Sequence, residues 1–259
     1  MDVSRFPIPM GGVPCGSVNA YLVGDDPALL VDPGGRTDAL DAAVAERNVV
    51  AVAATHTHAD HVGALAHYAA ETGATVYARR WFADRFRRAS GVDPDRTLLE
   101  GDAIPLGEES IAVLDTPGHT TGHLSFVAPE GILCGDLAVV EGSVAVLAPE
   151  GDMRAYLTAL RRLHARNPPA LFPGHGPVAD DPRATLERLI AHRDRRERRV
   201  AAAVAAGARE LPEVLDRAYE KDLTGVRSMA RATVRAHLEK LAVEGEIEWD
   251  GRRAAPGPG

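Results

Sequence analysis

Thr55-His56-Thr57-His58-Ala59-Asp60-His61 is the stretch that decides the fold of this 259-residue chain. Three histidines and a carboxylate within six positions form a pattern that packing rarely requires, whereas imidazole and carboxylate groups suit zinc and similar divalent ions. The apolar run at 49–54 precedes the stretch and predicts a buried strand, and a helix is expected directly after it. The sequence therefore predicts metal ligands at a strand-to-helix corner, rather than a polar loop whose histidines only bind the backbone.

Three further ligand candidates each follow a glycine near the end of a short apolar run. They are His119 after Gly118, Asp136 after Gly135 and His175 after Gly174. Glycine permits the sharp turn that brings backbone and ligand close to an ion. Seven ligands are too many for one tetrahedral ion, but they suit two ions that share a carboxylate and activate water for hydrolysis.

The order and spacing of these motifs closely resemble the metallo-β-lactamase superfamily, whose signature is His-x-His-x-Asp-His followed by Gly-His, Gly-Asp and Gly-His. The resemblance implies an α/β fold, a four-layered αββα sandwich, with two Zn²⁺ or similar ions per chain. The ligand set that it implies is His56, His58 and His119 for one ion, Asp60, His61 and His175 for the other, and Asp136 as the bridge. Asp60 is also a candidate proton acceptor, and hence the one catalytic residue that we name.

Secondary structure read from the pattern agrees with that fold, although periodicity alone predicts only a mixed α/β protein. The predicted strands lie at 19–23, 28–31, 49–54, 75–77, 111–114, 124–128 and 131–133. The predicted helices lie at 37–47, 61–72, 152–166 and 182–206.

Three residues beside the motifs, Asp32, His123 and Cys134, are not assigned as ligands. Asp32 and His123 are candidates for orienting the ligands from behind, because such partners fix a ligand histidine; the alternative for Asp32 is capping a turn. Cys134 is interpreted as a small buried apolar residue. True β-lactamases of the superfamily have cysteine or no carboxylate at the position of Asp136, so penicillin hydrolysis is not expected.

The C-terminal part predicts a second domain. We expect a catalytic domain at 1–181, a connecting helix at 182–206, a winged-helix-like domain at 207–253 and a disordered tail at 254–259. Val234, Leu238 and Leu241 form the predicted buried stripe of its second helix. The stretch at 172–178 and the following His192-Arg193 pair resemble a branch of β-lactamase-like endoribonucleases known from mitochondria, and this pair is placed on the substrate side.

Composition narrows the cellular context and the choice of substrate. The net charge is −8 and there are two cysteines, so no disulfide framework is implied. Neither an export leader nor a membrane-spanning run is recognisable, and a cytoplasmic protein is expected. Arg227, Arg231 and Arg235 recur every four residues, which suits either a phosphate backbone or an ordinary solvated face.

The preferred sequence-based function is metal-dependent cleavage of single-stranded RNA phosphodiesters, from the resemblance to the endoribonuclease branch. The alternative is a thioester or ester hydrolase of the glyoxalase II or acyl-thioesterase type, although basic glutathione-binding helices are not recognisable. Only 38 residues separate Asp136 from His175, which leaves no room for the domain inserted in larger ribonucleases. The expected partners are a small-molecule ester or single-stranded RNA and a second copy of the chain in a homodimer, with no membrane.

Overall fold

The computed structural model describes residues 1–220 and 222–257, and the chain forms two compact units. Unit 1 comprises Met1–Thr116, Gly122–Gly142 and Arg166–Thr185, and unit 2 comprises Pro117–Thr121, Ser143–Ala165 and Leu186–Gly259. Two segments that the sequence assigned to the first domain, 117–121 and 143–165, thus group with the C-terminal unit.

The first sheet of unit 1 has six strands in the order β1-β2-β3-β4-β5-β6. They are β1 (Val3–Pro9), β2 (Ser17–Val23), β3 (Ala28–Val31), β4 (Val49–Ala53), β5 (Thr75–Arg79) and β6 (Arg96–Leu98). The pairs β1–β2 and β2–β3 are antiparallel, and the pairs from β3 to β6 are parallel. The strands predicted at 19–23, 28–31, 49–54 and 75–77 are all present, whereas β1 and β6 had not been predicted.

The second sheet of unit 1 has five strands in the order β11-β10-β9-β8-β7. They are β7 (Ala103–Leu106), β8 (Glu109–Asp115), β9 (Leu124–Ala128), β10 (Gly131–Gly135) and β11 (Leu171–Pro173). Only the β10–β11 pair is parallel, so β10 and β11 direct their carboxyl ends to the same edge. The three strands predicted within 111–133 are present.

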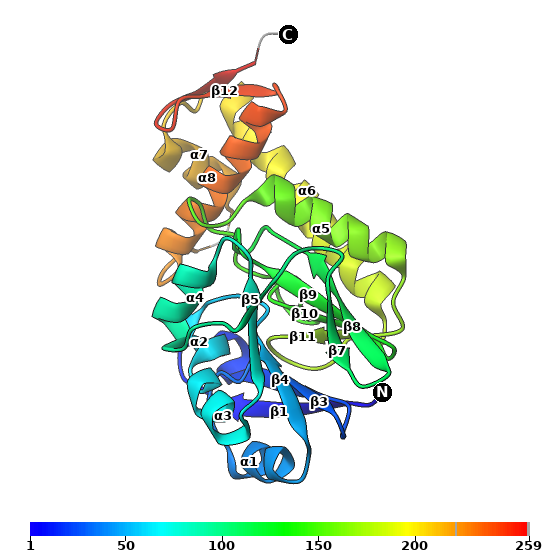
Figure 1. Ribbon diagram of the computed structural model, residues 1–259. Helices are drawn as coiled ribbons and strands as arrows, with labels where there is room; N and C mark the ends of the chain where they lie inside the picture. Colours follow the sequence, from blue (N-terminus) through cyan, green and yellow to red (C-terminus); the bar gives the residue numbers. More distant parts are fainter. Residues whose placement is uncertain (221, 258–259) are drawn as a thin grey trace. The chain divides into compact units, whose positions relative to one another are not determined.

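A continuous apolar core lies between the two sheets and includes Val31 and Ala53 from the first sheet and Phe126 and Leu133 from the second. A second core lies on the other face of the first sheet, where helices cover it (Figure 1). These helices are α1 (Asp38–Ala45), α2 (Ala59–Val62), α3 (Leu65–Thr72) and α4 (Ala83–Ser90). Unit 1 thus contains three of the expected layers, one of helices and two of strands. A fourth, helical layer remains a prediction.

Unit 2 is mainly helical. It is built from α5 (Met153–Arg166), most of α6 (Pro182–Ala205), α7 (Leu211–Ala218), α8 (Arg227–Val243) and an antiparallel pair, β12 (Ile247–Trp249) and β13 (Ala254–Pro256). The predicted stripe of α8 is buried, since Val234, Leu238 and Leu241 are each 0% exposed in the core of this unit.

The prediction of a disordered tail from residue 254 was wrong for the first three of its residues. They form β13, because their backbone pairs with β12 and the chain reverses at Asp250, whose carboxylate accepts the N–H groups of Arg252 and Arg253. The predicted tail residues 258 and 259 lie outside the described residues. Within the described part of the chain, no helix has both the length and the apolar character to cross a bilayer.

Candidate metal centre

The candidate ligands lie on segments that leave the carboxyl ends of strands. The His56–His61 segment follows β4 and ends in α2, which contains Asp60 and His61. The His119 loop follows β8, Asp136 directly follows β10, and His175 lies two residues after β11. Strands provide rigid anchors for such loops, so ligands from distant parts of the sequence can be held in a fixed arrangement.

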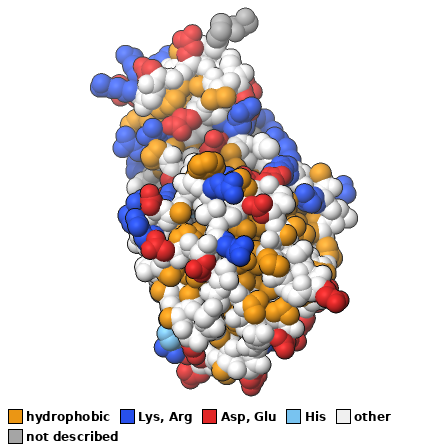
Figure 2. Space-filling view, viewed as in Figure 1, with side chains coloured by type: hydrophobic (Ala, Val, Ile, Leu, Met, Phe, Trp, Pro, Cys, Tyr) orange, Lys and Arg blue, Asp and Glu red, His pale blue; other side chains and the backbone are white. Residues whose placement is uncertain are grey.

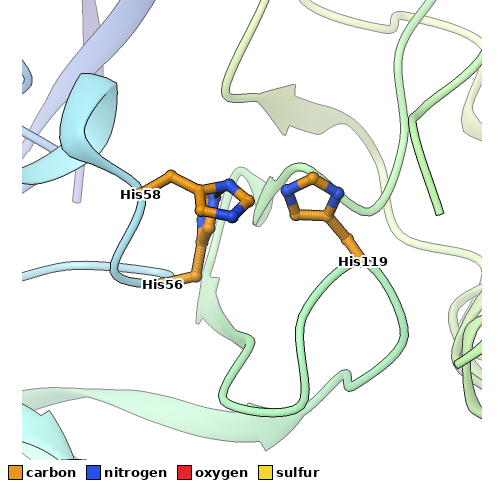
Figure 3. A group of neighbouring side chains, drawn as sticks. All are labelled: His56, His58 and His119. Atoms are coloured by element: carbon orange, nitrogen blue, oxygen red, sulfur yellow. Dashed lines mark hydrogen bonds between the residues drawn. The ribbon is translucent and has the colours of Figure 1, made fainter. Parts of the chain in front are cut away.

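All seven predicted ligands occur in three groups whose ligand atoms lie within 4.8 Å of one another. The groups are His56 with His58 and His119, Asp60 with His61 and His175, and His56 with His61 and Asp136. In the first group, the rings of His56 and His58 come from one loop and the ring of His119 faces them from another (Figure 3). His56 Nε2 and His58 Nδ1 are 3.0 Å apart, a distance at which two imidazole nitrogens can face the same ion.

Asp136 lies next to the second group as well. Its Oδ1 atom is 3.4 Å from His61 Nε2 and 3.5 Å from His175 Nε2, while Asp60 Oδ2 is 3.3 Å from His175 Nε2. Asp136 is therefore close to members of the second group as well as belonging to the group with His56 and His61.

Three of the histidines are oriented by hydrogen bonds from the ring nitrogen on the far side. His61 Nδ1 lies 3.0 Å from Asp32 Oδ2, His119 Nδ1 lies 2.6 Å from the Ala145 carbonyl, and His175 Nδ1 lies 2.7 Å from the Ser17 carbonyl. Because these oxygens accept, Nδ1 carries the proton and Nε2 has the lone pair that a metal needs. The Nε2 atoms of His61 and His175 are buried without a hydrogen-bond partner, as expected of atoms meant for an ion.

Asp32 and Thr55 link two of the ligands from behind. Asp32 is 1% exposed and accepts hydrogen bonds from the Thr55 N–H at 2.6 Å and the Thr55 hydroxyl at 2.7 Å, in addition to its contact with His61. The Thr55 hydroxyl oxygen is also 3.1 Å from His56 Nδ1. Asp32 was predicted to orient a ligand, but Thr55 was missed although it begins the motif.

His123 lies behind Asp136 and belongs to none of the ligand groups found among the described residues. Its Nε2 accepts the Asp136 N–H at 3.1 Å, and its Nδ1 is 2.9 Å from the Thr116 hydroxyl. Since Nε2 is engaged with the backbone, His123 is suited to fixing the Asp136 loop, and its role in orienting the ligands from behind stays a prediction.

The glycines beside the ligands are required by close approach. A Cβ atom at Gly174 would lie 2.6 Å from Asp136 Oδ1 and 2.6 Å from His61 Cε1, so only glycine leaves both ligand side chains in place. Gly135 has a φ of +46° in the left-handed region. The neighbouring Cys134 is fully buried, burial raises its pKa to about 12, and it is absent from the ligand groups formed by the described residues.

The electrostatics of the cluster favour added positive charge. Burial disfavours the charged form of His61, but the nearby carboxylates of Asp136, Asp32 and Asp60 outweigh it and raise the His61 pKa to about 9. Burial alone would raise the pKa of Asp60, but the neighbouring imidazoles of His175 and His61 lower it overall to about 2. A cluster of imidazole and carboxylate groups that favours positive charge fits divalent transition metals.

The two remaining candidates, His192 and Arg193, lie on α6 in unit 2. Neither belongs to a ligand group, and Arg193 is only 3% exposed. The substrate-side role expected of this pair stays a prediction.

Comparison with known proteins agrees with this geometry. Residues 13–175 match the model of the metallo-beta-lactamase superfamily. The chain therefore belongs to this superfamily, and with its His/Asp clusters it is a metal-dependent hydrolase.

Three curated relatives show the range of names within that family. A beta-lactamase-like protein 2 homolog of Caenorhabditis elegans is 28% identical over 89% of this chain and 80% of its own length. A hydroxyacylglutathione hydrolase of Methylococcus capsulatus is 34% identical over 72% of this chain and 77% of its own length. An atrochrysone carboxyl ACP thioesterase of Aspergillus fumigatus is 26% identical over 76% of this chain and 63% of its own length.

Among solved structures, a beta-lactamase domain protein from Burkholderia ambifaria matches 98% of this chain and 91% of its own, with a TM-score of 0.80 and 21% identity. At that identity, the likeness shows the fold alone.

Proposed function

We propose that this protein hydrolyses a thioester with two zinc or similar divalent ions held by the seven ligands. The observation that carries the proposal is the position of Asp136. Its Oδ1 atom lies 3.4 Å from His61 Nε2 and 3.5 Å from His175 Nε2 in the second group. Asp136 also belongs to a group that contains His56. One carboxylate at the junction of two ligand groups suits a pair of ions, rather than a single structural ion.

The chain's own residues prepare the chemistry. When bound, the divalent ions lower the pKa of water and polarise the bond to be cleaved. Asp32 and the carbonyls of Ser17 and Ala145 keep three imidazoles in the tautomer that offers Nε2, and His123 holds the Asp136 backbone. The Asp60 carboxylate, with its pKa lowered to about 2, stays ionised at neutral pH and is suited to holding a cation, and its role as a proton acceptor stays a prediction.

Thioester hydrolysis is preferred over RNA cleavage for two reasons. Two of the relatives are named as a hydrolase of an acylated glutathione and as a thioesterase. In addition, two of the three arginines expected to meet a phosphate backbone have carboxylate partners: Arg227 lies 2.6 Å from Asp216 and Arg235 lies 2.7 Å from Glu239.

The surface supports the same preference. Over the C-terminal elements on the face drawn in Figure 2, acidic side chains lie among the basic ones. Mixed charge of this kind does not favour a polyanion.

The test is hydrolysis by zinc-loaded protein of two substrates in parallel, an acylglutathione thioester followed by thiol release and a labelled single-stranded RNA. We expect the wild-type protein to release thiol and the His58→Ala protein to release none, because this variant lacks one of the candidate ligands. His67→Ala is the matched control, since His67 is on the surface of α3 beside Glu71 at 3.0 Å. Cleavage of RNA without thiol release would replace the proposal by the RNA alternative. If the protein catalyses neither reaction, both the thioester and the RNA proposal are overturned.

We further propose that 207–253 is a winged-helix-like domain. The order of α7, α8 and the β12–β13 pair supports it. A homodimer also remains a prediction, which light scattering of the purified chain tests.

A further inference from the structure

A pocket of about 270 Å³ lies entirely within unit 2, and none of the seven candidate ligands lines it. Its walls are residues 143–147, the middle of α6, and the segment that runs from Tyr219 into the first turns of α8. No acidic side chain lines it among the described residues. We call it the arginine pocket, after Arg193 and Arg196 in its wall.

Arg193 is a buried cation with unused hydrogen-bonding capacity. Its side chain donates to the Val144 carbonyl and its guanidinium lies 5.4 Å from the centre of the Tyr156 ring. Its Nε–H is buried without an acceptor, and within the described residues it forms no ion pair. Burying an unpaired charge is costly, so a site that keeps one is suited to receive an anion.

Arg196 adds a second guanidinium without a carboxylate partner. It lies 3.5 Å from the centre of the Tyr219 ring and donates to the Ala218 carbonyl at 2.5 Å. Glu220, which follows Tyr219 in the sequence, forms an ion pair with Arg199 at 3.1 Å. His192, which also lines the wall, stays neutral at pH 7, because burial and the surrounding arginines lower its pKa to about 4. The positive charge of the pocket therefore comes from arginines alone.

The outer part of the pocket is apolar. Val226 is 44% exposed and Met229 is 47% exposed, and they are two of the four large apolar side chains exposed in the described part of the chain. Exposed apolar groups beside unpaired guanidinium groups match a ligand with both an anionic and an apolar end.

We propose that the arginine pocket binds a small organic anion, a carboxylate or phosphate carried on an apolar chain. The anionic group binds Arg193 and Arg196, and the chain lies against Val226 and Met229. Ala145 also contacts one candidate ligand of the same unit, since it lines the pocket while its carbonyl accepts from His119 Nδ1 at 2.6 Å. The inference stands apart from the proposed thioester hydrolysis, because it concerns binding and requires no turnover.

Calorimetric titration of the purified chain with octanoate, octyl phosphate and neutral octanamide tests the proposal. We expect at least one of the two anions to bind at least tenfold more tightly than octanamide, and the tighter anion identifies the headgroup. Equal binding of octanamide and both anions, or no binding of either anion, would overturn it.

Variants locate the site. Met229→Glu places a carboxylate at the apolar mouth and should weaken the tighter anion at least tenfold. Arg196→Gln should weaken it while leaving octanamide unchanged. Val243→Glu is the matched control, since Val243 is 69% exposed on the same helix and does not line the pocket. The affinity of this variant for the anion should be within twofold of the wild-type value. Circular dichroism confirms that each variant is folded, and a folded Met229→Glu protein with unchanged anion affinity would refute the assignment.

Discussion

Replacing Gly174 by alanine tests how tightly the metal centre is built. The added Cβ would meet Asp136 Oδ1 and His61 Cε1, each at 2.6 Å, well inside the distance that real Cβ atoms keep. The backbone cannot easily retreat, because the Gly174 N–H donates to the Gly135 carbonyl at 2.9 Å and its carbonyl accepts from the Asn19 N–H at 2.8 Å. The strain must therefore displace two metal ligands.

Overpacking of this kind costs roughly 1–3 kcal/mol. Expressed as lost metal affinity, this corresponds to a decrease of about 5- to 150-fold. Zinc affinity is measured by competition with a chromophoric chelator, and circular dichroism checks the fold. Gly11→Ala is the control, because a Cβ there meets nothing within 4 Å and its φ is not in the left-handed region. Wild-type affinity for both ions in a folded Gly174→Ala protein would refute the reasoning.

Three other outcomes are expected. Asp32→Asn removes the charge 3.0 Å behind His61 Nδ1 and should weaken zinc binding roughly 10- to 100-fold, and a loss below threefold in the same competition assay would contradict this role. In the folded protein the pKa of His192 is about 4, below its ordinary value of 6.5, so neutral His192 contributes fully to stability above pH 6.5 and this contribution is lost as the pH falls toward 4. The urea concentration at the midpoint of unfolding should therefore fall less between pH 7.5 and pH 5 in His192→Gln than in the wild type. Neutralising Arg227, Arg231 and Arg235 together should leave the salt dependence of RNA binding unchanged, whereas a flatter slope would restore the RNA interpretation.

The sequence was most informative where chemistry restricts residue type. The ligands were recognisable because few side chains bind divalent ions, and the strands leading to them because buried strands are runs of apolar residues. The edge strand β1 (Val3–Pro9) was missed, since it contains Pro7 and Pro9 and is largely exposed. Helix α4 was missed because its only large buried apolar side chain is Phe86 among charged neighbours.

Contacts made through the backbone could not be predicted. The carbonyls of Ser17 and Ala145 orient His175 and His119, but any residue type supplies a carbonyl, so the sequence contains no signal for them. Arg193 was singled out as a substrate-side residue only through a family resemblance. Its burial without an ion pair depends on how residues 143–147, α6 and α8 pack within unit 2, and no local pattern encodes that.

The metal content of the dialysed protein, determined by elemental analysis, tests the central claim most directly. The seven grouped ligands predict two equivalents of a divalent transition metal per chain in the wild type. Asp136→Ala should retain fewer, because it removes the carboxylate placed between the groups. One equivalent or none in the wild type, with the Asp136→Ala protein unchanged, would contradict the dinuclear centre and the hydrolytic mechanism built on it.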